Sequence, residues 1–154
     1  MTYNQLLQVA EDEDIEVIEM SFKGGINGLY SDNTIAINSN IETQVEKKCI
    51  LAEELGHHFT SIGNILDQKS LSSRKQEIIA RRWGYDKLIS LRKLIQAFNY
   101  GCRNKYELAD FLDITEQYLD EILKYFEAKY GLYVEIGDYC IYFNPLTIAK
   151  YNYE

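Results

Sequence analysis

The sequence has little of what marks secreted, membrane-spanning or linker-rich proteins. It contains one proline in 154 residues, so no proline-rich linker divides it. Its three cysteines are an odd number without CxxC spacing, which argues against a disulfide framework and favours a reducing compartment. Residues 1–5 show no signal-peptide character, and no run approaches the roughly 20 apolar residues of a membrane helix. These absences predict a cytoplasmic protein without a membrane span.

Acidic side chains dominate the charge, and they are unevenly distributed. There are 24 acidic and 16 basic residues, a formal net charge of −8, which argues against general nucleic-acid binding. Residues 1–73 carry −8, residues 74–104 carry +6 and residues 105–154 carry −6. The basic stretch is typical of a solvated helix face between acidic flanks. The 46% hydrophobic content is that of a globular protein.

The hydrophobic pattern predicts an α+β fold in which short strands precede a run of helices. We expect a first unit over residues 1–100 and a small helical unit with a terminal strand over 101–154. The predicted helices are 3–10, 43–62, 73–90, 91–100, 104–112 and 115–130, and the predicted strands are 15–20, 28–30, 34–38 and 139–143.

The helix predicted over 43–62 combines apolar residues on most sides with four ionisable ones. Both histidines of the chain, His57 and His58, lie here together with Glu53 and Glu54. Burying such groups is costly unless they pair or bind a metal. Glu53 and His57 stand four residues apart, about 40° around the helix, so they can converge on one ion. The alternative is a solvent edge or a buried ion pair.

A third ligand is expected on the following helix. Glu77 is the acidic residue of a segment rich in lysine and arginine, and Ala80 and Gly84 share its face. Small residues there, and Gly56 on the preceding helix, would let two antiparallel helices approach closely. The alternative for Glu77 is a salt bridge with Arg81.

Several ordered segments resemble one protein family. Glu53-Glu54-Leu55-Gly56-His57 resembles the HELGH form of the HExxH motif in the ImmA/IrrE family of zinc metallo-endopeptidases, in particular its phage and mobile-element branch. The resemblance covers nearly the whole chain, including segments 28–33, 46–52, 77–83, 106–115 and 137–146.

The resemblance implies a zincin-like metallopeptidase core, a small sheet with an active-site helix, followed by a helical C-terminal part. It implies a cytoplasmic enzyme that cleaves a helix-turn-helix repressor of a prophage or mobile element. Glu54 is then the general base, and Glu53, His57 and Glu77 hold one divalent metal, zinc first and manganese as the alternative. The metal would polarise the scissile carbonyl and acidify a water, and Glu54 would take its proton.

Glu53 departs from the family pattern, which has histidine at the first ligand position. Two anionic ligands reduce the Lewis acidity of an ion and favour harder metals such as manganese. Three outcomes stay open: an active enzyme that uses Glu53, an enzyme with another metal preference, and an inactive relative that only binds a repressor. Two alternative ligand choices are also open: Glu54 with His58, which are four residues apart, and the thiolate of Cys49.

Two further segments invite functional readings. Residues 107–119 have the rhythm of a helix-turn-helix, but the second helix offers mainly acidic side chains, so DNA reading is disfavoured. A DNA-binding regulator over 104–130 is kept as an alternative to a subdomain that packs on the catalytic part or docks a basic repressor. By analogy with zincins, strand 34–38 is a candidate for pairing with extended substrate.

Overall fold

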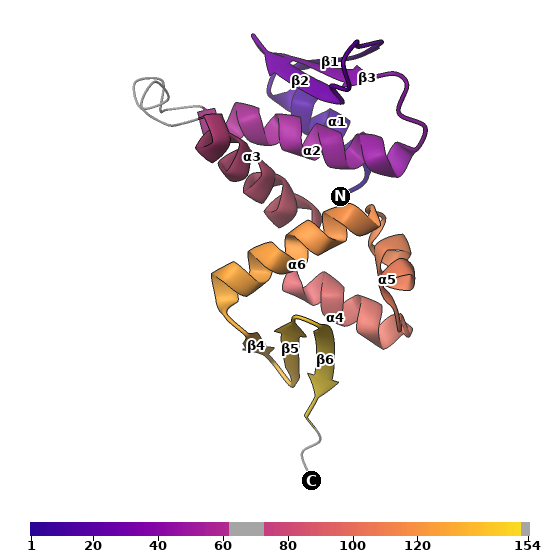
Figure 1. The fold of residues 1–154 in the computed structure, drawn as a ribbon, viewed down its shortest axis with the longest axis vertical. Coiled ribbons are helices and arrows are strands. Elements are labelled where there is room, and N and C mark those ends of the chain that lie inside the picture. The colour runs from indigo at the N-terminus through magenta and orange to yellow at the C-terminus, as the bar shows by residue number, and fades with distance from the viewer. Residues whose placement is uncertain (62–72, 152–154) are drawn as a thin grey trace. The chain divides into compact units, whose positions relative to one another are not determined.

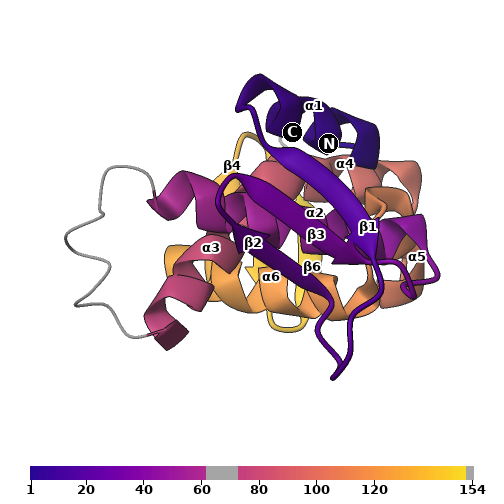
Figure 2. The same cartoon turned by 90° about the horizontal axis from the view of Figure 1, so that it is seen from above.

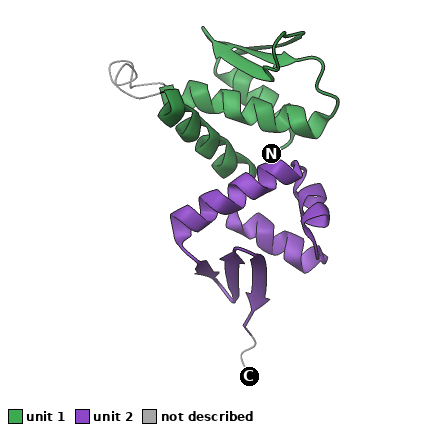
Figure 3. Cartoon of the chain, in the orientation of Figure 1, with its two compact units in different colours: residues 1–88 green, residues 89–154 purple. Residues whose placement is uncertain are grey.

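The chain divides into two compact units. The computed structural model describes residues 1–61 and 73–151. The first unit is Met1–Leu88 and the second is Ile89–Glu154 (Figure 3). The helix that follows residue 90 therefore belongs to the second unit, whereas our sequence boundary at residue 100 had placed it in the first. In the residues described, no helix is long and apolar enough to cross a membrane.

The first unit begins with a helix and a small sheet and continues with two longer helices (Figure 1). Its elements are α1 (Tyr3–Asp12), β1 (Glu16–Met20), β2 (Gly28–Ser31), β3 (Thr34–Asn38), α2 (Gln44–Ser61) and α3 (Ser73–Leu88). Thr2 caps α1 in a reciprocal capping box with Gln5. Thr43 Oγ1 accepts a hydrogen bond from the Glu46 backbone N–H at 3.2 Å, so α2 starts where the sequence predicted.

The sheet of the first unit has the order β1-β3-β2. β1 pairs with β3 in parallel and β2 pairs with β3 antiparallel, with Gly28 opposite Ile37 and Ser31 opposite Thr34. The prediction that strand 34–38 could pair with substrate is wrong, because β3 is central and already paired on both sides. Among the described residues, the edges of this sheet are β1 and β2.

The core of the first unit lies between the sheet and its helices. β2 and β3 lie against α2, and α1 packs beside α2 and β1 (Figure 2). Leu6, Ile35, Ile37, Leu51 and Leu55 are fully buried there. Burial of apolar side chains is the main favourable term in folding, and here it fixes α2 against the sheet.

α2 and α3 form the closest contact of two helices in this unit. α3 returns along α2 in roughly the opposite direction (Figure 1). A Cβ added to Gly56 would collide with the backbone carbonyl of Ala80, so only glycine permits this approach. The rings of Phe59 on α2 and Trp83 on α3 also stack, with centroids 4.8 Å apart. The turn that must join the predicted helices 43–62 and 73–90, which we expect near residues 63–64, lies outside the described residues.

The second unit is a set of helices followed by an antiparallel sheet. Its elements are α4 (Leu91–Tyr100), α5 (Lys105–Leu112), α6 (Glu116–Tyr130), β4 (Tyr133–Ile136), β5 (Tyr139–Phe143) and β6 (Leu146–Lys150). The side chains of Ser90, Asn104 and Thr115 cap the three helices. The sheet order is β4-β5-β6. Our prediction of one terminal strand was therefore incomplete, because β4 and β6 flank it.

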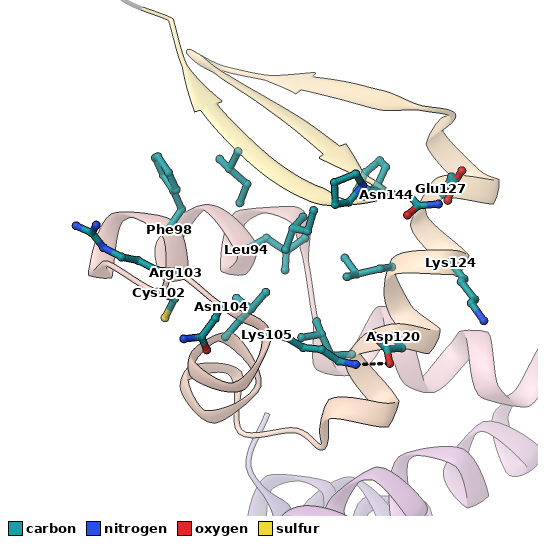
Figure 4. Close-up of a pocket in the computed structure, with 17 residues that line it drawn as sticks. Leu94, Phe98, Cys102, Arg103, Asn104, Lys105, Asp120, Lys124, Glu127 and Asn144 are labelled. Carbon is teal, nitrogen blue, oxygen red and sulfur yellow. Dashed lines mark hydrogen bonds and ion pairs between the residues drawn. The ribbon is translucent and has the colours of Figure 1, made fainter.

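A cavity of about 480 Å³ lies within the second unit, between its helices and the β5–β6 hairpin (Figure 4). Buried Leu94, Leu119 and Phe143 contribute to its apolar lining. Lys105 Nζ and Asp120 Oδ2 lie 2.6 Å apart at its edge. All residues that line this cavity belong to the second unit, so it is separate from the ionisable cluster on α2.

Gly56→Ala tests the helix contact. In an isolated helix this change is favourable by roughly 0.5–1 kcal/mol. Here the added methyl group meets backbone that cannot rotate away, so we expect a destabilisation of about 2–4 kcal/mol in urea unfolding. Gln96→Ala, on the exposed face of α4, is the control and should change stability by less than about 0.5 kcal/mol. Equal or greater stability of Gly56→Ala would show that the contact is loose.

Candidate metal centre

Two facing helices bring three potential ligands together. Glu53 and His57 lie one turn apart on α2, and Glu77 lies on α3. One ligand atom of each residue lies within 4.8 Å of those of the other two. His57 Nε2 and Glu77 Oε1 lie 3.3 Å apart. The structure therefore assembles the three residues that the sequence had nominated, and all three are half-buried.

The donor set fits a divalent metal ion. Zinc binds imidazole nitrogen and carboxylate oxygen at about 2.0–2.2 Å, so two donors of a tetrahedral ion lie roughly 3.3–3.5 Å apart. The 3.3 Å between His57 Nε2 and Glu77 Oε1 matches that separation. A set of one nitrogen and carboxylate oxygens suits zinc, and also manganese because oxygen ligands favour harder ions.

Arg81 extends the cluster on the side of Glu53. Its Nε donates a hydrogen bond to Glu53 Oε1 at 3.3 Å. Burial raises the pKa of Glu53, and the charge and hydrogen bond of Arg81 act in the opposite direction. Glu53 and His57 are four residues apart on α2, and Glu77 and Arg81 are four residues apart on α3. Because the two helices run in opposite directions, Glu53 faces Arg81 and His57 faces Glu77.

Glu54 points away from bulk solvent beside the three candidate ligands. Glu54 is only 8% exposed. Burial, followed by the negative charges of Glu53 and Glu77, raises its pKa to about 8. The edge strand reaches it at Gly28, where an added Cβ would lie 2.9 Å from Glu54 Oε1. A carboxyl group with a pKa near neutrality can both accept and return a proton.

His58 faces the sheet and α1 and is used in packing. Its Nδ1 lies 2.8 Å from the Tyr30 hydroxyl, and its Nε2 lies 3.1 Å from Glu13 Oε2. A neutral imidazole satisfies both contacts by accepting from Tyr30 and donating to Glu13. The ring is therefore engaged at both nitrogens, which argues against the shifted pair of His58 with Glu54. Cys49 is a buried cysteine and is not among the three clustered residues.

Sequence reasoning missed three contributors to this region: Arg81 as partner of Glu53, Gly28 beside Glu54, and Tyr30 on His58. Arg81 carried a usable signal, since its spacing of four from Glu77 mirrors the spacing of Glu53 and His57. The contacts of Gly28 with Glu54 and of Tyr30 with His58 could not be predicted from spacing, because they depend on which strand forms the edge of the sheet.

Such a cluster, with a buried carboxyl group beside two ligands on one helix, is the arrangement used by metal-dependent peptidases of the HExxH class. A family model supports this class, because residues 10–131 match a peptidase family described as the IrrE N-terminal-like domain. The chain belongs to that family, and its α+β fold with a helical C-terminal part agrees with membership. Searches of curated proteins and of solved structures gave no match.

The burial of Glu54 predicts a pH-dependent stability of the metal-free protein. The folded-state pKa of about 8 exceeds the ordinary value of 4.5. The contribution of protonated Glu54 to the free energy of unfolding is therefore fully present below pH 4.5 and is lost as the pH rises through 8. With a chelator present, Glu54→Gln should therefore be more stable than the parent at pH 8.5, on the order of 1–3 kcal/mol, and nearly equal at pH 5.

Urea unfolding at the two pH values measures this difference. Exposed Glu42→Gln is the matched control and should show no such pH dependence. A stability difference for Glu54→Gln that is the same at pH 5 and pH 8.5 would contradict the assigned burial effect.

Proposed function

We propose that this protein is a metal-dependent endopeptidase, with Glu53, His57 and Glu77 as metal ligands and Glu54 as general base. The observation that carries the proposal is the convergence of three ligand atoms within 4.8 Å, next to a buried carboxyl group. Membership of a peptidase family supports the same reaction class. The cofactor is one divalent ion, zinc first and manganese as the alternative.

The chemistry divides between the ion and the protein. A bound divalent ion supplies Lewis acidity toward the peptide carbonyl and toward water. Glu54 removes a proton from the attacking water and delivers it to the leaving amine. A bound cation would favour the ionised form of the nearby Glu54 carboxyl group, which is the form that can accept a proton.

The strand β2 is the candidate edge for an extended substrate. It is an edge strand of the first sheet, and its Gly28 closely approaches Glu54. Leu29, which alternates with the helix-facing residues, is 50% exposed. A peptide added to this edge would gain backbone hydrogen bonds and would place a peptide bond near Glu54. Edge pairing requires an extended, locally unfolded segment of the target protein.

The substrate that we propose is a helix-turn-helix repressor of a prophage or mobile element, in the cytoplasm. The resemblance of the helix 53–57 segment to the ImmA/IrrE pattern supports it. Charge complementarity supports it as well, since the chain carries a formal net charge of −8 and DNA-binding repressors are commonly basic. The protein itself is not expected to bind nucleic acid.

A second function is a repressor-binding protein without peptidase activity. The observation that favours it is the carboxylate of Glu53 at a position where the family pattern has histidine. Two anionic ligands would lower the Lewis acidity of the ion. Metal content separates the alternatives: less than a tenth of an equivalent after reconstitution with zinc or manganese would exclude the enzyme.

Two substitutions test the assigned roles. Glu54→Gln removes the base but keeps a similar shape, so we expect full metal content and at least a 100-fold loss of cleavage. His57→Ala removes a ligand, so we expect loss of the metal as well as of activity. Metal analysis and mass determination of fragments measure the two effects after incubation with a helix-turn-helix repressor encoded beside the gene.

A chelator added to the parent protein should abolish the fragments, and zinc should restore them. Exposed Glu42→Gln serves as the control for removal of a carboxylate and should cleave at the parent rate. Cleavage by Glu54→Gln at the parent rate would show that another group is the base.

A further inference from the structure

A positive charge lies directly beside the residue in which this site departs from the usual ligand pattern. Arg81 Nε lies 3.3 Å from Glu53 Oε1, and Arg81 is on the same helix as Glu77, one turn farther along. The hydrogen bond from Arg81 Nε is accepted by Oε1 of Glu53. The other oxygen has its own lone pairs and can face an ion.

The charges of the site show what this contact achieves. A histidine at position 53 would be a neutral ligand. Glu53 instead adds a negative charge to those of Glu77 and the ionised Glu54, and the guanidinium of Arg81 returns one positive charge. The Glu53–Arg81 pair therefore has the net charge of a neutral histidine, although it binds through oxygen.

We propose that Arg81 is a positioning residue that compensates the charge of Glu53, so that the pair replaces a neutral histidine ligand. The inference rests on the metal site of the proposed function. A carboxylate that shares its charge with a guanidinium donates less strongly to an ion, which keeps the ion a better Lewis acid. Partners of metal ligands commonly change metal affinity or activity by 10- to 100-fold.

A simple inter-helix salt bridge is the competing explanation. The Arg81 side chain is 48% exposed and that of Glu53 is 29% exposed. Solvent-exposed pairs contribute little to stability. If the pair only ties α2 to α3, its loss would loosen the site and weaken Zn²⁺ binding. If it compensates charge, its loss leaves Zn²⁺ binding at least as tight and lowers only the Lewis acidity of the ion.

The experiment is a double-mutant cycle of Glu53→His and Arg81→Gln in the full-length protein. Zn²⁺ affinity is measured by competition with a chromophoric chelator. Lewis acidity is measured as the affinity of the Co²⁺-loaded protein for neutral imidazole, from the visible spectrum at pH 8. Imidazole carries no charge at this pH, so direct attraction to Arg81 does not distort the comparison.

With Glu53 present, Arg81→Gln should bind Zn²⁺ at least as tightly as the parent, because a positive charge near the ion is removed. Imidazole affinity should fall about 10-fold. In the Glu53→His background, Arg81→Gln should change imidazole affinity by less than about 2-fold. Arg81→Lys keeps the charge and should recover most of the imidazole affinity, and Arg92→Gln in the second unit should have no effect.

Three results would overturn the inference. These are an equal loss of imidazole affinity in both backgrounds, no loss in the presence of Glu53, or a 10-fold weaker Zn²⁺ binding by Arg81→Gln. The metal site itself fails in a different way. If neither the parent nor Glu53→His binds Zn²⁺ or Co²⁺, the proposed function is wrong. If only Glu53→His binds, His57 and Glu77 are ligands, but the Glu53–Arg81 pair is no substitute for histidine.

Discussion

The close antiparallel contact of α2 with α3 is the constraint on which the candidate site depends. Gly56 lies against the Ala80 carbonyl, where no side chain fits. With the helix axes this close, side chains one turn apart on one helix meet side chains one turn apart on the other. His57 then faces Glu77 and Glu53 faces Arg81. A wider spacing would leave the carboxylates as ordinary surface charges.

Local sequence signals predicted the helices and the clustering of Glu53, His57 and Glu77, and they failed where the answer depended on strand pairing. The capping residue Thr43 predicted the start of α2, and the spacing of Glu53 and His57 indicated that both lie on one face of the helix. Whether β3 was central could not be read from its residues, because β2 precedes it in the chain and lies beyond it in the sheet. β4 and β6 were missed because much of their surface is exposed, which weakens the hydrophobic signal.

The structure brings the basic stretch of the sequence into contact with the acidic segment that precedes it. The basic stretch after residue 73 had looked like a solvated helix face, and much of it is exposed. Arg81 is different because it contacts a carboxylate of the acidic first segment. Its positive charge thus lies beside the cluster of Glu53, Glu54 and Glu77, where burial and the repulsion of like charges raise the pKa of Glu54.

One helix also sets the position of β2, the proposed substrate edge, relative to Glu54, the proposed general base. Residues two apart on a strand are separated by about 6.6 Å, close to the roughly 6 Å rise between residues four apart on a helix. Gly28 and Tyr30 on β2 accordingly meet Glu54 and His58 on α2. Because two contacts fix both the position and the direction of a strand, β2 cannot slide by a residue without losing the Tyr30 hydrogen bond. The buried histidine that binds no metal in our proposal thereby holds the edge strand beside the base.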